Sequence, residues 1–221
     1  MSVLETLEIE TGPQPSAAVI WLHGLGADGY DFEPIVPELA LPDTLPVRFV
    51  FPHAPMRPVT INDGAVMRAW YDIFSLEGVR REDDAGIRAS QEGVEALIAR
   101  ERSRGVPPSR LVLAGFSQGG AIALHTGLRY ADRLAGIMAL STYVPLASTL
   151  TAEASLANRD VPIFMAHGRD DSLIAIERAA ISRDLLRHAG YKVEWHEYAM
   201  DHAVCREEID AVAGWLRRIL A

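Results

Sequence analysis

The chain lacks several features that mark other classes of protein. It has one cysteine, Cys205, among its 221 residues, so an internal disulfide framework is excluded and a reducing, cytoplasmic environment is expected. No apolar run approaches the roughly 20 residues that a membrane-spanning helix needs, so no stable membrane insertion is expected. The first residues also lack a basic region followed by an apolar core, so no signal peptide is expected.

Positive charge is scarce as well. Lysine and arginine number 21 against 30 acidic residues, which gives a net charge of −9. Because no face rich in lysine or arginine is apparent, neither nucleic acid nor an anionic membrane surface is an expected partner. What remains is an ordinary composition, 49% hydrophobic and 23% charged. A chain of this length can bury one sizeable core, so we predict a single domain over residues 1–221.

Apolar runs and amphipathic windows alternate along the chain. The expected strands are an edge strand at 3–9 and further strands at 17–22, 47–51, 111–114, 134–140, 161–166 and 193–198. The expected helices cover 31–39, 83–104, 121–130, 174–189 and 204–220, with Asp83 or Asp84 capping the second. Strands alternating with helices predict the α/β class, with a mostly parallel sheet and helices on both faces.

One stretch carries the clearest chemical signal. The apolar run Leu111–Ala114 meets Gly115-Phe116-Ser117-Gln118-Gly119, and a helical pattern follows at once. A strand, a sharp turn and a helix with serine at the apex form a nucleophile elbow, and the flanking glycines let the two elements close together. The serine hydroxyl would then lie at a helix N-terminus, where unpaired N–H groups favour a developing negative charge.

The segment 52–81 shows no sustained period, although it holds apolar side chains such as Met67, Trp70 and Tyr71. A long irregular segment inside a compact domain is often functional. Its apolar side chains either form the wall of a substrate pocket or simply cover the sheet, and the pattern does not choose between these two interpretations.

Ligands of parallel α/β sheets bind beyond the carboxyl ends of the strands. The loops that follow four of the expected strands carry His23-Gly24-Leu25-Gly26, Ser117, Asp170-Asp171 and Asp201-His202. A serine hydroxyl needs a base, and imidazole is suited because its pKa lies near ~6.5.

His202, on the loop before the last helix, is the favoured base, and His53 remains a candidate. His23 and His167 stand at strand ends and are expected to hold backbone there. An acid must orient the imidazole, and Asp170 and Asp171 are both candidates, one of which could cap the following helix. The chain order of serine, acid and histidine is that of α/β-hydrolases.

An oxyanion would need two N–H donors. One is the residue after the nucleophile, Gln118, and the other should come from the glycine-containing loop 23–26.

The chain resembles the carboxylesterases related to acyl-protein thioesterases and lysophospholipases, within the α/β-hydrolases. The matching pieces span nearly the whole chain: WLHGLGADGYDF at 21–32, RAWYDI at 68–73, AGFSQGGAIAL at 114–124, ALSTYVP at 139–145, HGRDD at 167–171 and YAMDHAVCREEI at 198–209.

This resemblance implies roles for particular residues. It assigns the triad acid to Asp171 and the base to His202, and the oxyanion donors to Leu25 and Gln118. It also suggests Trp70 at the substrate pocket, where we further expect Met67 and Val144. One departure is Asp201, where the family often has glycine before the histidine.

The function expected from these observations is hydrolysis of short- to medium-chain carboxylic esters through an acyl-enzyme on Ser117, without metal or cofactor. The substrate would be a small ester or an acylated molecule, and the resemblance allows a homodimer. The segment between Leu140 and Asp160 is too short for a large lid domain.

Alternatives remain. The enzyme could be an acyl-protein thioesterase or a lysophospholipase. A dienelactone-hydrolase-like enzyme is disfavoured because serine, not cysteine, stands at the elbow. A non-catalytic ligand-binding module on the same scaffold is disfavoured because every triad candidate is present.

Overall fold

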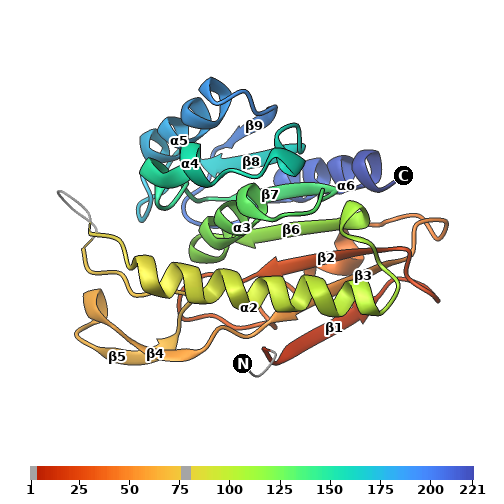
Figure 1. Cartoon of the computed structure of the whole chain (residues 1–221), viewed down its shortest axis with the longest axis horizontal. Coiled ribbons are helices and arrows are strands. Elements are labelled where there is room, and N and C mark those ends of the chain that lie inside the picture. Colours follow the sequence, from red (N-terminus) through yellow and green to blue (C-terminus); the bar gives the residue numbers. More distant parts are fainter. Residues whose placement is uncertain (1–3, 76–80) are drawn as a thin grey trace.

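The computed structural model describes residues 4–75 and 81–221, and within them seven strands form the main sheet (Figure 1). The strand order is β1-β3-β2-β6-β7-β8-β9. The strands are β1 (Thr6–Glu10), β2 (Ala17–Leu22), β3 (Val47–Pro52), β6 (Leu111–Phe116), β7 (Gly136–Leu140), β8 (Ile163–Gly168) and β9 (Val193–Tyr198). Only β1, at one edge, runs antiparallel to its neighbour, so the mostly parallel sheet is confirmed.

The strand predictions hold because both faces of the sheet are covered. All six residues of β2, β3 and β8 are buried, and such strands appear in the sequence as mainly apolar runs, unbroken in β2. The bounds of β2 and β9 are those predicted. The edge strand begins at Thr6, and the first position of its predicted range, Val3, lies outside the described residues.

Helices lie on both sides of the sheet, as predicted. They are α1 (Ile35–Glu38), α2 (Asp84–Ser103), α3 (Gln118–Arg129), α4 (Leu150–Glu153), α5 (Ile176–His188) and α6 (Arg206–Leu220). Apolar residues of α2, α3 and α5 pack into one core cluster, and those of α1 and α6 pack into another on the opposite face. In Figure 1, α2 and α3 cross in front of the sheet and α6 lies behind it.

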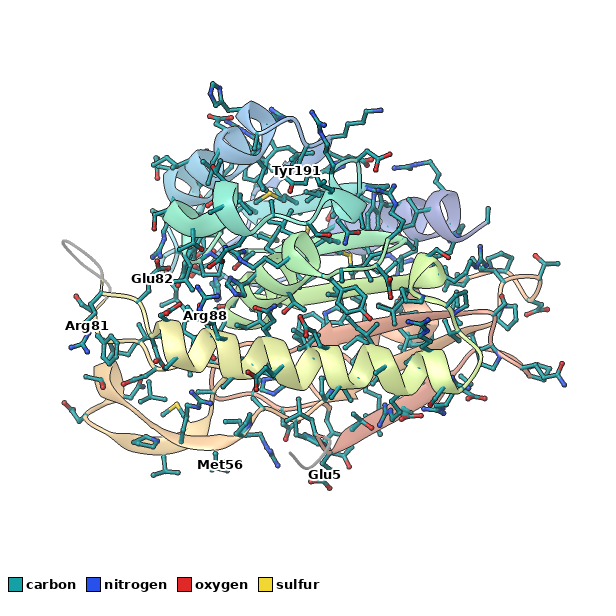
Figure 2. The ribbon with its side chains drawn as sticks, in the orientation of Figure 1. Glu5, Met56, Arg81, Glu82, Arg88 and Tyr191 are labelled. Atoms are coloured by element: carbon teal, nitrogen blue, oxygen red, sulfur yellow. The ribbon has the colours of Figure 1, made fainter. Side chains whose placement is uncertain are left out.

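The long helix α2 is fixed at its start and along its side. Asp83 caps it by accepting a hydrogen bond from Gly86 N–H at 2.9 Å. Arg88 extends from α2 toward α4 (Figure 2), and its Nη2 lies 2.8 Å from a carboxylate oxygen of Glu153. Arg129 of α3 pairs with the same carboxylate at 2.7 Å. The hydrogen bonds from these two guanidinium groups lower the pKa of Glu153 to about 2, so this carboxylate joins three helices.

The irregular segment 52–81 contains a feature that the sequence interpretation missed. Strands β4 (Met56–Val59) and β5 (Ala65–Arg68) pair as a separate two-stranded antiparallel sheet. Asp63 and Gly64 both have positive φ, 52° and 76°, in the turn between them. Val59 pairs with Ala65, and a short loop that contains glycine between two extended runs is a sequence signal of a hairpin. Residues 76–80 of the segment lie outside the described residues.

The segment 141–162, between β7 and β8, holds α4 and short single-turn helices and no inserted domain. The loops at the carboxyl edge of the sheet are therefore not overlaid from this side by a lid. Among the described residues, no helix is both long and apolar enough to cross a membrane.

The start of α3 packs directly on the end of β2. A Cβ added at Gly119 would lie 2.3 Å from the carbonyl oxygen of Leu22 and 2.5 Å from that of His23. At Gly115 it would lie 2.4 Å from the carbonyl carbon of Gly119. Real Cβ atoms cannot approach backbone so closely, so the two glycines are required for this contact.

We therefore expect Gly119→Ala to lower the free energy of unfolding by about 2 kcal/mol or more, because strand and helix must move apart. Gly214→Ala in α6 is the matched control, since its added Cβ would meet only the end of the flexible Arg218 side chain, at 3.8 Å. It should stabilise the protein by roughly 0.5–1 kcal/mol, as alanine does in a helix interior. Urea unfolding of both variants checks this, and equal effects would contradict the packing argument.

A buried carboxyl group lies near the start of α6. Glu208 has no exposed surface, and burial raises the pKa of its side chain to about 8. Below pH 4.5 the group is protonated in both the folded and the unfolded chain, so its contribution to stability is fully present there and does not change with pH. Between pH 4.5 and about 8 the unfolded chain releases this proton and the folded chain keeps it. Stability contributed by the neutral group is therefore lost as pH rises through this window.

Glu208→Gln removes this titration. The variant should gain stability over the wild type as pH rises from 5 to 8, by up to about 1.4 kcal/mol per pH unit. Glu207→Gln, an exposed neighbour, is the control and should give a difference that barely changes with pH. Urea unfolding at several pH values measures both, and a pH-independent effect of Glu208→Gln would refute the assignment.

Candidate active site

Ser117 stands at the turn between β6 and α3, in a backbone conformation that serine rarely adopts. Its φ is 53° and its ψ is −120°, which costs on the order of 1–3 kcal/mol. Two hydrogen bonds hold the turn against the end of β7 and the residues that follow it. Ser117 N–H donates to the carbonyl of Leu140 at 2.8 Å, and the Thr142 hydroxyl donates to the Ser117 carbonyl at 2.6 Å. The serine side chain is thereby held at the N-terminus of α3, facing a cavity.

His202 and Asp171 form a pair beside this serine. His202 Nδ1 lies 2.8 Å from Asp171 Oδ2, and the Asp171 side chain has no exposed surface. The other oxygen of Asp171 accepts hydrogen bonds from the N–H groups of Leu173 and Ile174 at 2.9 and 2.8 Å. One oxygen of the carboxylate therefore caps the following turn, while the other bonds the imidazole. The His202 ring packs on Phe116, with 4.7 Å between ring centroids, and lines the same cavity as Ser117.

The loops that carry the aspartate and the histidine are joined by backbone. Arg169 N–H donates to the carbonyl of Tyr198 at 2.8 Å, and Asp170 N–H donates to that of Met200 at 3.1 Å. A Cβ added at Gly168 would lie 2.3 Å from the Met200 carbonyl oxygen, so glycine permits this approach. Asp170 itself is exposed. Of the two aspartates that the residues alone left open, Asp171 is the one whose carboxylate bonds His202.

Asp201, the departure from the family pattern, has a structural contact. Its Oδ1 accepts hydrogen bonds from Ser172 N–H and Oγ, both at 2.8 Å, and from His202 N–H at 2.7 Å. These bonds lower the pKa of the Asp201 carboxyl. The carboxylate ties the histidine loop to the aspartate loop.

Three other histidines that stand in loops or at strand ends hold backbone. His23 Nε2 accepts from Ala54 N–H at 3.1 Å while its Nδ1 lies 2.6 Å from the Gly24 carbonyl. Burial lowers the pKa of His23 to about 4, so the ring is neutral and carries its proton on Nδ1. His53 Nδ1 accepts from Gly29 N–H at 3.0 Å, and His167 Nε2 lies 2.8 Å from the Ile174 carbonyl. His53, which the sequence left as a candidate base, therefore uses a ring nitrogen to hold the backbone of Gly29.

The two expected oxyanion donors lie on the same cavity. Leu25 and Gln118 both line it, and Gly26 N–H anchors the Leu25 loop by donating to the Arg68 carbonyl at 2.9 Å. Gln118 is the first residue of α3, so its N–H has no acceptor within the helix. Its side chain points elsewhere, accepting from Trp70 N–H at 2.8 Å and donating to the Tyr71 carbonyl at 2.7 Å.

The cavity has a volume of about 480 Å³ and a mixed wall. Apolar side chains from the loop after β2 (Leu25) and from the irregular segment 52–81 (Ile61 and Ile73) line it together with the serine and the histidine. The irregular segment therefore does contribute a pocket wall. Sequence reasoning missed Tyr143 and Arg178, which also line it.

The prediction of the pocket residues differs from the structure. None of Trp70, Met67 and Val144 is among the residues that line this cavity. Trp70 is fully buried, and its indole Nε1–H donates to the His23 carbonyl at 2.9 Å. It supports the wall from behind. Val144 is also buried, and Met67 lies on β5 near Gly26.

Within the described residues, no three histidine, cysteine, aspartate or glutamate side chains gather closely enough to hold a metal ion. The polar groups at the cavity are those of acid–base and nucleophilic chemistry.

The sheet topology and the serine turn define an α/β-hydrolase. The chain belongs to the phospholipase/carboxylesterase family, whose model matches residues 4–220. This membership confirms the predicted fold and family, and it supports a hydrolase of the esterase and thioesterase kind.

Individual relatives agree with this placement. The chain is 41% identical to acyl-protein thioesterase 1 of Neurospora crassa over 211 residues, which cover 91% of this chain and 86% of the relative. It is 35% identical to a probable carboxylesterase of Oryza sativa subsp. japonica over 219 residues, 94% of this chain and 82% of the relative. The crystal structure of Zea mays acyl-protein thioesterase 2 superposes with a TM-score of 0.87 at 28% identity, covering 98% and 99% of the two chains.

Proposed function

We propose that the protein is a serine hydrolase that cleaves carboxylic esters of short to medium acyl chain through an acyl-enzyme on Ser117. The observation that supports this most is the pair formed by His202 and the buried Asp171 carboxylate on the cavity that Ser117 lines. An imidazole held through Nδ1 by a carboxylate presents Nε2 as a base, which is the arrangement that activates a serine.

The proposed reaction has two halves. Ser117 Oγ attacks the substrate carbonyl carbon while His202 Nε2 accepts its proton, and the N–H groups of Leu25 and Gln118 donate to the oxyanion. The C–O bond to the alcohol then breaks, and His202 returns the proton to the leaving oxygen. Water attacks the acyl-enzyme by the same route and regenerates the serine. No metal or cofactor enters either half.

A thioester is the second candidate substrate, because the names of relatives at about 40% identity include acyl-protein thioesterase. The same residues would act on it, with a thiol in place of the alcohol as leaving group. Turnover of an oxyester and a thioester with the same acyl chain separates the two. We also propose, on the single cysteine and the family, a cytoplasmic location. A homodimer remains a prediction.

Ser117→Ala and His202→Ala should each lower kcat for a para-nitrophenyl ester on the order of 10⁶-fold, because nucleophile and base act as one unit. The double variant should be little worse than either single one. Steady-state hydrolysis measures this. Losses that simply multiply in the double variant would contradict a shared mechanism.

A matched pair of variants tests the acid. Asp171→Asn keeps the shape of the side chain but removes the charge that fixes the His202 tautomer, so kcat should fall by roughly 10⁴. Asp170→Asn, one residue away and exposed, should stay within about twofold of the wild type, as surface substitutions usually do. If Asp170→Asn is the more damaging change, the assignment of the acid is wrong.

A further inference from the structure

Arg178 brings a positive charge to the cavity of the proposed active site. It lies in the first turn of α5, and it lines the same cavity as Ser117 and His202. Its side chain is half-buried, so solvent does not fully surround the guanidinium. Hydrolysis of a simple neutral ester has no use for a cation at this place.

Within residues 4–75 and 81–221, no hydrogen bond or ion pair engages the N–H edge of this guanidinium. Its central carbon lies over the Tyr143 ring, 3.4 Å from the ring centroid, and the Tyr143 hydroxyl lies 3.0 Å from that of Tyr71. Stacking uses the flat face of a guanidinium, while its five N–H donors point outward in the plane. Among the described residues, no carboxylate lies within 4.0 Å of Arg178.

Arg183, one to two turns further along α5, is an arginine of the same helix whose N–H groups do bond a carboxylate. It also lies over an aromatic ring, that of Trp195 at 4.9 Å, but its Nε and Nη2 bond the Asp184 carboxylate at 2.8 and 3.0 Å. Arg183 does not line the cavity. The two arginines thus differ in what meets their N–H edges: within the described residues a carboxylate bonds that of Arg183, and none bonds that of Arg178.

A carboxyl group lines the same cavity, so the cavity carries both signs of charge. Asp31, on the loop after β2, lines the cavity too, and burial together with the nearby Asp28 carboxylate raises the pKa of its side chain. Two acids in proximity repel a further anion. A negatively charged group in the cavity is therefore disfavoured on the Asp31 side and favoured at Arg178.

We infer that Arg178 binds an anionic group of the substrate, a carboxylate or a phosphate, so that the enzyme prefers esters bearing a negative charge away from the scissile carbonyl. A guanidinium held flat on Tyr143 presents two parallel N–H groups, which match the oxygens of either anion. The inference rests on the proposed ester hydrolysis and specifies its substrate class. The anion could be carried by the acyl part or by the alcohol part of the ester.

Two pairs of substrates test this. For the acyl part, mono-para-nitrophenyl adipate is compared with para-nitrophenyl hexanoate, which has the same chain length and no charge. For the alcohol part, the butyrate ester of para-hydroxybenzoate is compared with that of its methyl ester. The quantity measured is the ratio of kcat/KM for the anionic over the neutral member, which does not depend on the fraction of enzyme that is folded.

The ratio for at least one pair should fall roughly tenfold to a hundredfold in Arg178→Gln, the size expected for loss of a charge-assisted hydrogen bond. Most of the change should lie in KM for the anionic ester. Arg178→Lys, which keeps the charge without the paired donors, should retain part of the preference. Arg183→Gln is the matched control and should leave both ratios as in the wild type.

The outcomes distinguish a failure of the proposed ester hydrolysis from a failure of the proposed anion binding by Arg178. A fall confined to one pair supports the inference and assigns the anion to the acyl or the alcohol part. If the wild type hydrolyses the esters but Arg178→Gln leaves both ratios unchanged, the inference is overturned and ester hydrolysis stands. If the wild type hydrolyses none of the four esters, the proposed function fails and the inference fails with it.

Discussion

The close packing of the start of α3 against the end of β2 is the constraint on which the site depends. Gly115 and Gly119 let strand β6 turn into α3 within one residue, and that residue is Ser117, at φ 53°. The contact fixes the serine at the N-terminus of a helix, and it also brings the loop of Leu25 beside it. Ser117, the proposed nucleophile, and the expected oxyanion donors are therefore placed by the same backbone contact.

A second backbone contact, between the ends of β8 and β9, sets the other half of the site. The approach permitted by Gly168 brings Asp171 under His202, and Asp201 ties the two loops together from the solvent side. Because β6, β8 and β9 end at the same edge of a parallel sheet, residues more than 80 positions apart meet without an inserted domain. The polar centre thus depends on the backbone of the sheet edge, while much of the cavity wall comes from irregular segments, such as those of Ile61 and Ile73.

Much of this follows from the sequence, and the failures have physical causes. Strands such as β2 could be predicted because burial on both faces demands an unbroken apolar run. The hairpin of β4 and β5 was not predicted, because the exposed apolar residues Met56 and Val66 break the alternation of apolar and polar residues expected of a strand. Asp63 and Gly64, both at positive φ, nevertheless lie in its turn. The pocket residues were misplaced because an aromatic residue such as Trp70 looks the same in a sequence whether it lines a cavity or supports it from behind. Arg178 gave no signal, since only tertiary packing lays it over Tyr143.

The central claim is that the hydroxyl of Ser117 is an activated nucleophile. Incubation of the folded protein with a fluorophosphonate, followed by mass spectrometry of its peptides, tests this most directly. The account predicts one adduct, on Ser117, which is lost in His202→Ala. A folded protein that takes no label, or takes it on another residue, would contradict the account and would favour a binding role for the cavity.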